Sequence, residues 1–178
     1  MAIDYNLFYF SSAPRTGSTW GIKAFHAVGL GAGFKAHVHK VHTKREFEIC
    51  LSFVRHPCDW LASYYAALHG GMTGVQEVDV LNFPAIDFDE FIRNYLKNCP
   101  GAVGRAFKAY NASCHIKIED TPWAVVTFLE SMGVPKKMRN NCLGLNPQNI
   151  SKHLPRWSPH LYAQVQESEK ELVDEYNY

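Results

Sequence analysis

Residues 11–20 read Ser-Ser-Ala-Pro-Arg-Thr-Gly-Ser-Thr-Trp, a stretch rich in turn-forming residues. It follows Tyr5–Phe10, a short run of apolar and aromatic residues that predicts a buried strand. It leads into a segment that predicts a helix up to about Val28, because a cluster of glycines beginning at Gly29 then stops it. A strand, a loop of glycine and hydroxyl residues, and a helix together form the arrangement that binds phosphate. The stretch therefore predicts an anion-binding loop.

Each part of this loop supplies something that a bound phosphate needs. The backbone N–H groups at the start of the helix carry partial positive charge. Gly17 lets the backbone approach an anion closely, and Ser18 and Thr19 add hydroxyl donors. Arg15 contributes a full charge and two parallel donors. The spacing is shorter than in the Walker A pattern and the cation precedes the glycine, so a turn that only caps the helix is the alternative.

The rest of the chain alternates between predicted strands and predicted helices. Further strands are expected at Phe34–His39, Ile49–Val54 and His115–Ile118. Helices are expected after Arg55 and from caps at Asp87, Thr121 and Ser158. A long loop at 69–86 has the length of a functional lid. This order predicts a three-layer α/β fold, with a mainly parallel sheet flanked by helices, in a single domain spanning 1–178.

The composition excludes several classes of function. Charged residues make up 20% of the chain and the net charge is +1, so we expect no bulk attraction to nucleic acid or to an anionic membrane. No apolar run approaches the roughly 18 residues that span a bilayer, and no basic region of a signal peptide precedes the first strand. The five cysteines are dispersed, without a CxxC pair, which favours reduced thiols. These features predict a soluble cytoplasmic protein.

A second anion-binding element follows the strand at Ile49–Val54. Arg55 comes directly after this strand, and Ser63 lies eight positions further on, in the expected helix. Ligands of open parallel sheets lie at the carboxyl ends of the strands, where two such elements could hold two phosphates of one nucleotide. Taken singly, Arg55 could instead form a surface ion pair with Asp59, and the Ser63 hydroxyl could bond back to the helix backbone.

These two segments resemble one enzyme family. Pro14–Trp20 resembles the PKSGTTW loop of sulfotransferases that use 3′-phosphoadenosine-5′-phosphosulfate (PAPS), and Val54–Tyr65 resembles their RxPxDxxxSYY segment, with the same spacing from Arg to Ser. Weaker similarity is found at Ile116–Asp120, Phe128–Gly133 and Leu172–Tyr176. The likeness spans most of the chain. It implies a P-loop-type α/β fold and transfer of a sulfuryl group from PAPS, with 3′-phosphoadenosine-5′-phosphate (PAP) as the product and no metal.

The resemblance also implies roles for individual residues. Arg15 stands where the family usually has lysine and would contact the bridging oxygen as the sulfuryl group leaves. Trp20 would stack on adenine, and Arg55 and Ser63 would hold the 3′-phosphate. The 5′-phosphate would be bound by Thr16, Gly17, Ser18 and Thr19. The chain departs from the family at Ile118, where a tyrosine helps to hold the base, and it has no clear match to the RKG-type segment, for which Lys152 or Arg156 could substitute.

Three histidines are candidates for the base that deprotonates the acceptor. They lie between the two phosphate motifs, and a histidine titrates near neutral pH, as a general base should. The order of preference is His39, His37 and His42, because His39 falls nearest the expected strand end. The same HxHxxH pattern could bind a metal, but no carboxylate or cysteine accompanies it at close spacing. Glu119 and Asp120 are weaker candidates for acid–base work.

The leading interpretation is thus a sulfotransferase that acts on a small-molecule or glycan acceptor. An ATP-dependent small-molecule kinase is one alternative, although the Walker lysine is missing. A non-catalytic protein that binds PAP or another nucleotide is a second. Trp123, Trp157 and most of the tyrosines and phenylalanines are expected in the core by their size and apolar character.

Overall fold

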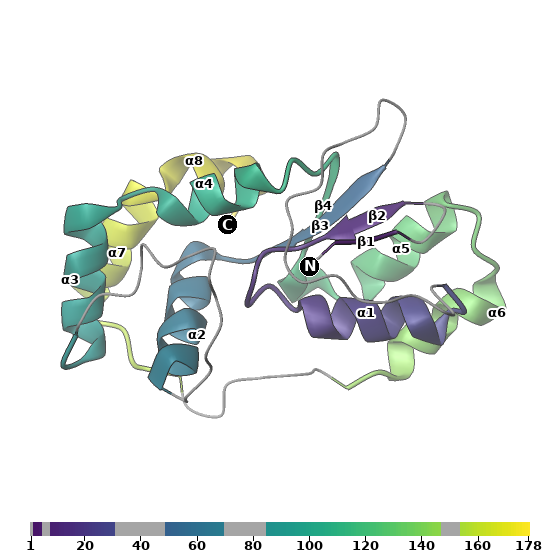
Figure 1. The fold of residues 1–178 in the computed structure, drawn as a ribbon, viewed down its shortest axis with the longest axis horizontal. Helices are drawn as coiled ribbons and strands as arrows, with labels where there is room; N and C mark the ends of the chain where they lie inside the picture. The colour runs from purple at the N-terminus through teal and green to yellow at the C-terminus, as the bar shows by residue number, and fades with distance from the viewer. Residues whose placement is uncertain (1, 5–7, 31–48, 70–84, 147–153) are drawn as a thin grey trace. The chain divides into compact units, whose positions relative to one another are not determined.

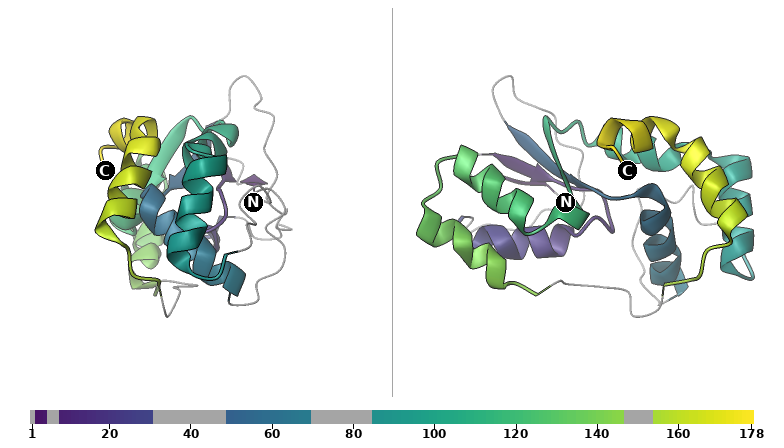
Figure 2. Two further views of the ribbon diagram at one scale, coloured as in Figure 1. Left: turned by 90° about the vertical axis from the view of Figure 1, so that its left-hand side faces the viewer. Right: turned by 180° about the vertical axis from the view of Figure 1, so that it is seen from behind.

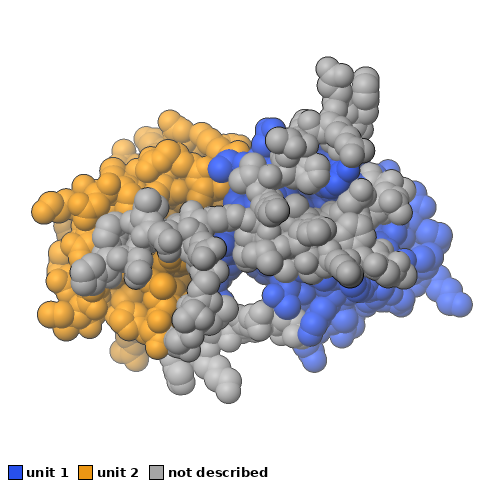
Figure 3. All heavy atoms as spheres, in the orientation of Figure 1, with its two compact units in different colours: residues 1–55, 109–150 blue, residues 56–108, 151–178 orange. Residues whose placement is uncertain are grey.

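The computed structural model describes residues 2–4, 8–30, 49–69, 85–146 and 154–178 (Figure 1). The described chain forms two compact units, each built from two separate stretches of sequence (Figure 3). Unit 1 comprises residues 1–55 and 109–150, and unit 2 comprises residues 56–108 and 151–178. The expected strand Phe34–His39 and most of the expected lid lie outside the described residues. The single domain expected from the sequence stays a prediction.

Unit 1 contains a four-stranded sheet in the order β1-β2-β3-β4. Strand β1 (Ala2–Asp4) pairs antiparallel with β2 (Tyr9–Ser11), whereas β2, β3 (Cys50–Val54) and β4 (Cys114–Lys117) run parallel. The three parallel strands confirm the predicted ones, with ends that differ by a few residues, and β1 was not predicted. An α/β fold with a parallel sheet is therefore confirmed. The carboxyl ends of β2, β3 and β4 share one edge of the sheet.

Helices α1 (Ser18–Ala27) and α5 (Trp123–Ser131) pack on one face of this sheet (Figure 1). Phe8 lies edge-on to Phe25 of α1 and to Phe128 of α5, with ring centroids 5.1 and 4.9 Å apart. Helix α1 approaches most closely at Gly21, where an added Cβ would lie 2.7 Å from a ring carbon of Phe53. The described residues of unit 1 also form three shorter helices, namely η2 (Ile118–Asp120), α6 (Lys136–Arg139) and η3 (Asn140–Gly144).

The described part of unit 2 is helical. Its helices are α2 (Pro57–His69), α3 (Phe88–Asn98), α4 (Ala102–Ala109), α7 (Pro159–Ser168) and α8 (Lys170–Tyr176). The Asp87 carboxylate accepts a hydrogen bond from the Glu90 N–H at 2.8 Å, which confirms the predicted cap of α3. Ser158 precedes α7 as predicted. Helix α4 was not predicted.

Candidate anion-binding site

The predicted phosphate loop lies at the carboxyl edge of the parallel strands. Strand β2 ends at Ser11 and is followed by the loop 12–17 and helix α1. Strand β3 ends at Val54 and is followed by Arg55, while β4 runs into η2. Parallel sheets bind ligands at this edge, because the loops that follow neighbouring strands converge there. The loop, Arg55 and η2 belong to unit 1, so their mutual geometry is described.

Hydroxyl groups hold the loop together from inside. Ser12, Ala13 and Thr16 are buried, and the Thr16 hydroxyl donates a hydrogen bond to the Ala13 carbonyl at 2.5 Å. The Ser12 Oγ lies 2.5 Å from the same Thr16 oxygen. Because the Thr16 hydroxyl is bonded within the loop, we expect this side chain to influence a bound anion by fixing the conformation of the loop. Ser18 and Thr19, in the first turn of α1, are half-buried.

The start of helix α1 carries the partial positive charge of the helix dipole and has no acidic residue beside it in the first turn. Gly17 occupies the N-cap position, where it offers no side-chain acceptor, and the first turn contains no acidic residue. The first N–H groups of a helix lack partners within the helix, and Gly17 has no side chain that could accept from them. Arg15 and Gly17 both have left-handed backbone conformations, with φ of 65° and 80°. A non-glycine residue in this conformation is typical of ligand-binding turns.

Gly17 is also the point at which the loop meets η2. A Cβ added to Gly17 would lie 2.3 Å from Ile118 Cδ1 and 2.9 Å from Ile118 Cγ1. Such separations are far below van der Waals contact, so a side chain at this position would displace Ile118. Position 17 therefore requires glycine for two reasons. The backbone conformation is left-handed, and Ile118 lies too close for a side chain. Sequence reasoning noted Ile118 only as a departure from the family and did not predict this contact.

Arg15 and Arg55 are brought together beside the loop. Arg55 Nη1 donates a hydrogen bond to the backbone carbonyl of Arg15 at 3.2 Å. Burial lowers the pKa of the Arg15 guanidinium, and the positive charge of Arg55 lowers it further. Two half-buried cations of like charge repel one another, and an anion bound between them would offset that repulsion. Together with the start of α1, they form a local concentration of positive charge in a chain whose net charge is only +1.

Other predicted site residues have different surroundings. The Trp20 side chain is only 5% exposed and packs against Phe53 in the core, which leaves little indole surface for a base. Ser63 is buried in α2 of unit 2, and its expected role stays a prediction. The candidate bases His37, His39 and His42 lie outside the described residues.

The expectation that Trp123 lies in the core is wrong, because its side chain is 67% exposed. Trp123 begins helix α5, two positions before Val125, the first residue that this helix buries. Its size and apolar character predicted burial, but its position on the helix turns it outward. Trp157 packs edge-on against Phe88 in unit 2, with ring centroids 4.8 Å apart.

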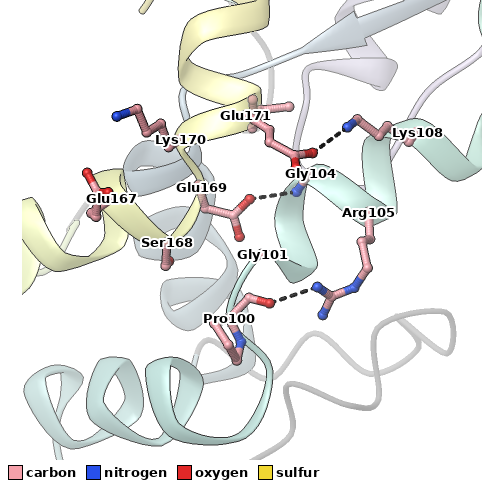
Figure 4. Close-up of a pocket in the computed structure, with 11 residues that line it drawn as sticks. Pro100, Gly101, Gly104, Arg105, Lys108, Glu167, Ser168, Glu169, Lys170 and Glu171 are labelled. Atoms are coloured by element: carbon pink, nitrogen blue, oxygen red, sulfur yellow. Dashed lines mark hydrogen bonds and ion pairs between the residues drawn. The ribbon is translucent and has the colours of Figure 1, made fainter.

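Unit 2 contains a polar pocket of about 470 Å³ beside the buried carboxylate of Glu169 (Figure 4). Glu169 accepts hydrogen bonds from the Val103 and Gly104 N–H groups at 3.0 and 2.8 Å, and from the Tyr95 hydroxyl. Burial raises the pKa of this carboxyl, although the three donors act in the opposite direction. The carboxylate thereby caps helix α4 from a distant part of the chain, and no sequence pattern singled it out.

Comparisons with models of protein families, with curated proteins and with solved structures found no match. The chemistry of the site is therefore inferred from its own residues. Within the described ranges, none of the helices combines the length and the apolar character that crossing a bilayer requires. The same residues contain no cluster of three or more metal-ligating side chains.

Proposed function

We propose that this protein is a PAPS-dependent sulfotransferase with a P-loop-type, three-layer α/β fold. The observation that carries the proposal is the proximity of Arg15 and Arg55, joined by a hydrogen bond, at the loop where Gly17 begins helix α1. This arrangement favours an anion of more than one charge, such as the terminal groups of a phosphosulfate. The sequence resemblance supplies the identity of the donor.

The described residues suit the two tasks of the donor site. The Gly17–Ser18–Thr19 segment and the first N–H groups of α1 would bind the 5′-phosphate. The Gly17 backbone could contact this phosphate directly, because no side chain lies between them. Arg15 would stabilise the negative charge that develops on the bridging oxygen. Arg55, fixed by its hydrogen bond to the Arg15 carbonyl, would bind a further phosphate oxygen.

In sulfuryl transfer an acceptor oxygen or nitrogen forms a bond to sulfur while the bond from sulfur to the phosphate oxygen breaks. The acceptor's proton passes to a base, for which His39, His37 and His42 are the candidates in that order. The electron pair of the broken bond stays on the phosphate of PAP, next to Arg15. Positioning and electrostatic stabilisation supply the rate enhancement, as in phosphoryl transfer.

A direct test follows release of PAP from PAPS in the presence of a phenol, a sugar alcohol and an amine as acceptors. We expect turnover with at least one acceptor class, and loss of turnover with retained PAP binding in one of His37→Ala, His39→Ala or His42→Ala. Phosphate transfer from ATP with Mg²⁺ would instead indicate the kinase alternative. Tight PAP binding with no turnover on any acceptor would indicate a non-catalytic nucleotide-binding protein.

A further inference from the structure

Trp123 is an exposed aromatic residue at the start of helix α5, five residues after Ile118, which packs against the loop. It is 67% exposed, whereas every other described Phe, Tyr and Trp of unit 1 is more than nine-tenths buried. Helix α5 packs on the sheet through Val125, Phe128 and Leu129, so Trp123 contributes little to the core. Exposing a large indole to water is unfavourable, and the fold does not require it at this position.

The chain between Ile118 and Trp123 keeps this indole near the loop. Ile118 packs directly on Gly17, as described above. The Thr121 hydroxyl and N–H then both donate to the Ile118 carbonyl, at 2.6 and 3.2 Å, so the chain turns back on itself within three residues. Trp123 follows two residues later, and even a fully extended chain would carry it at most about 17 Å from Ile118. Figures 1 and 2 show the start of α5 near the start of α1.

A nucleotide bound at the loop needs an apolar surface for its base, and Trp20 offers little. The Trp20 ring is buried against Phe53 and would have to leave the core to stack on a ligand. Trp123 is exposed, and it begins the helix that follows β4 and η2 at the same edge of the sheet. Stacking of a base on such a ring contributes about 1–3 kcal/mol, independently of the phosphate contacts.

We propose that Trp123 stacks on the base of the adenine nucleotide whose phosphates bind at the loop. This inference rests on the proposed function and assigns Trp123 a binding role that the sequence resemblance gives to Trp20. Two separate groups of residues would then recognise the two parts of the nucleotide. The loop, Arg15 and Arg55 bind the anionic part, and Trp123 binds the base.

The test separates these two parts by using two ligands, PAP and inorganic pyrophosphate, which has no base. Affinities are measured by calorimetry for the wild type, Trp123→Ala, Trp123→Phe and the control Met138→Ala. Met138 is also an exposed apolar residue of unit 1, but it lies beside Gly29, after the C-terminal end of α1. We expect Trp123→Ala to weaken PAP binding roughly 5- to 150-fold and to leave pyrophosphate binding unchanged. Trp123→Phe should restore most of the loss, and Met138→Ala should bind both ligands as the wild type does.

Two results would overturn the inference while leaving the proposed function intact. One is wild-type affinity of Trp123→Ala for PAP, and the other is an equal loss of affinity for PAP and pyrophosphate. A wild type that binds neither ligand would overturn the proposed function and the role of Trp123 together. Quenching of tryptophan fluorescence by PAP that persists in Trp123→Ala at full amplitude would also count against stacking.

Discussion

Replacing Gly17 by alanine tests the packing of the loop against η2. The new Cβ meets Ile118 Cδ1 at 2.3 Å and Cγ1 at 2.9 Å, in a backbone conformation with φ of 80°. The left-handed conformation costs a non-glycine residue about 1–2 kcal/mol. The added methyl group costs about 1–3 kcal/mol more, because Ile118 must move. We therefore expect Gly17→Ala to lower the free energy of unfolding by about 2–5 kcal/mol.

Gly133→Ala provides a matched control in the same unit. Gly133 has a φ of 76°, but nothing lies within 4 Å of a Cβ added there. Both substitutions restrict the unfolded chain equally, so the difference between them isolates the clash with Ile118. Urea unfolding followed by circular dichroism measures that difference, which should be about 1–3 kcal/mol.

A double variant completes this experiment. Ile118→Ala removes both carbon atoms that the new methyl group would meet. In that background, the cost of Gly17→Ala should fall to the cost of Gly133→Ala. Equal destabilisation by Gly17→Ala and Gly133→Ala in the wild-type background would refute the close contact between the loop and η2.

Three further predictions concern other parts of the chain. Gly21→Ala should lower the melting temperature even though alanine is the better helix former by about 1 kcal/mol, because its Cβ would lie 2.7 Å from Phe53 and 2.9 Å from Phe10; an unchanged or higher value would contradict this. Burial raises the pKa of the Glu169 carboxyl, so the stability it contributes is complete below the ordinary carboxyl pKa and is lost as the pH rises through the raised value. Glu169→Gln should remove that decline when urea unfolding is measured as the pH is raised from below the ordinary carboxyl pKa, and an identical pH profile would argue against it. Burial raises the pKa of the Cys58 thiol to about 12, so Cys58 should resist a thiol reagent in the native protein and react only after denaturation; rapid native labelling would contradict its burial.

The sequence predicted those features that depend on local patterns. The strand before the loop, the start of α1, the cap of α3 and the start of α7 at Ser158-Pro159 each follow from residues a few positions apart. Helix α4 was missed because it is short, because it contains Gly104, a poor helix former, and because its N-terminus is capped by Glu169, 65 residues away. Strand β1 was missed because three residues carry too little periodicity to be recognised.

The parts of the site that were not predicted depend on contacts between distant segments. Nothing in the local sequence places Ile118 against Gly17 or directs the Arg55 side chain to the Arg15 carbonyl. The outward position of Trp123 depends on which face of α5 meets the sheet. Residue type alone predicted a buried tryptophan, and the helix geometry overrode it.

The most direct test of the anion-binding site is a calorimetric titration with PAP and, separately, with ATP and Mg²⁺. The variants are Arg55→Ala and the control Arg93→Ala, which removes an exposed arginine paired with Asp89 in unit 2. We predict that the wild type and Arg93→Ala bind PAP in preference to ATP. Arg55→Ala should bind PAP roughly 10- to 150-fold more weakly, because it loses a hydrogen bond between charged groups. No PAP binding by the wild type, a preference for ATP with Mg²⁺, or unchanged affinity in Arg55→Ala would contradict a PAPS site at this loop.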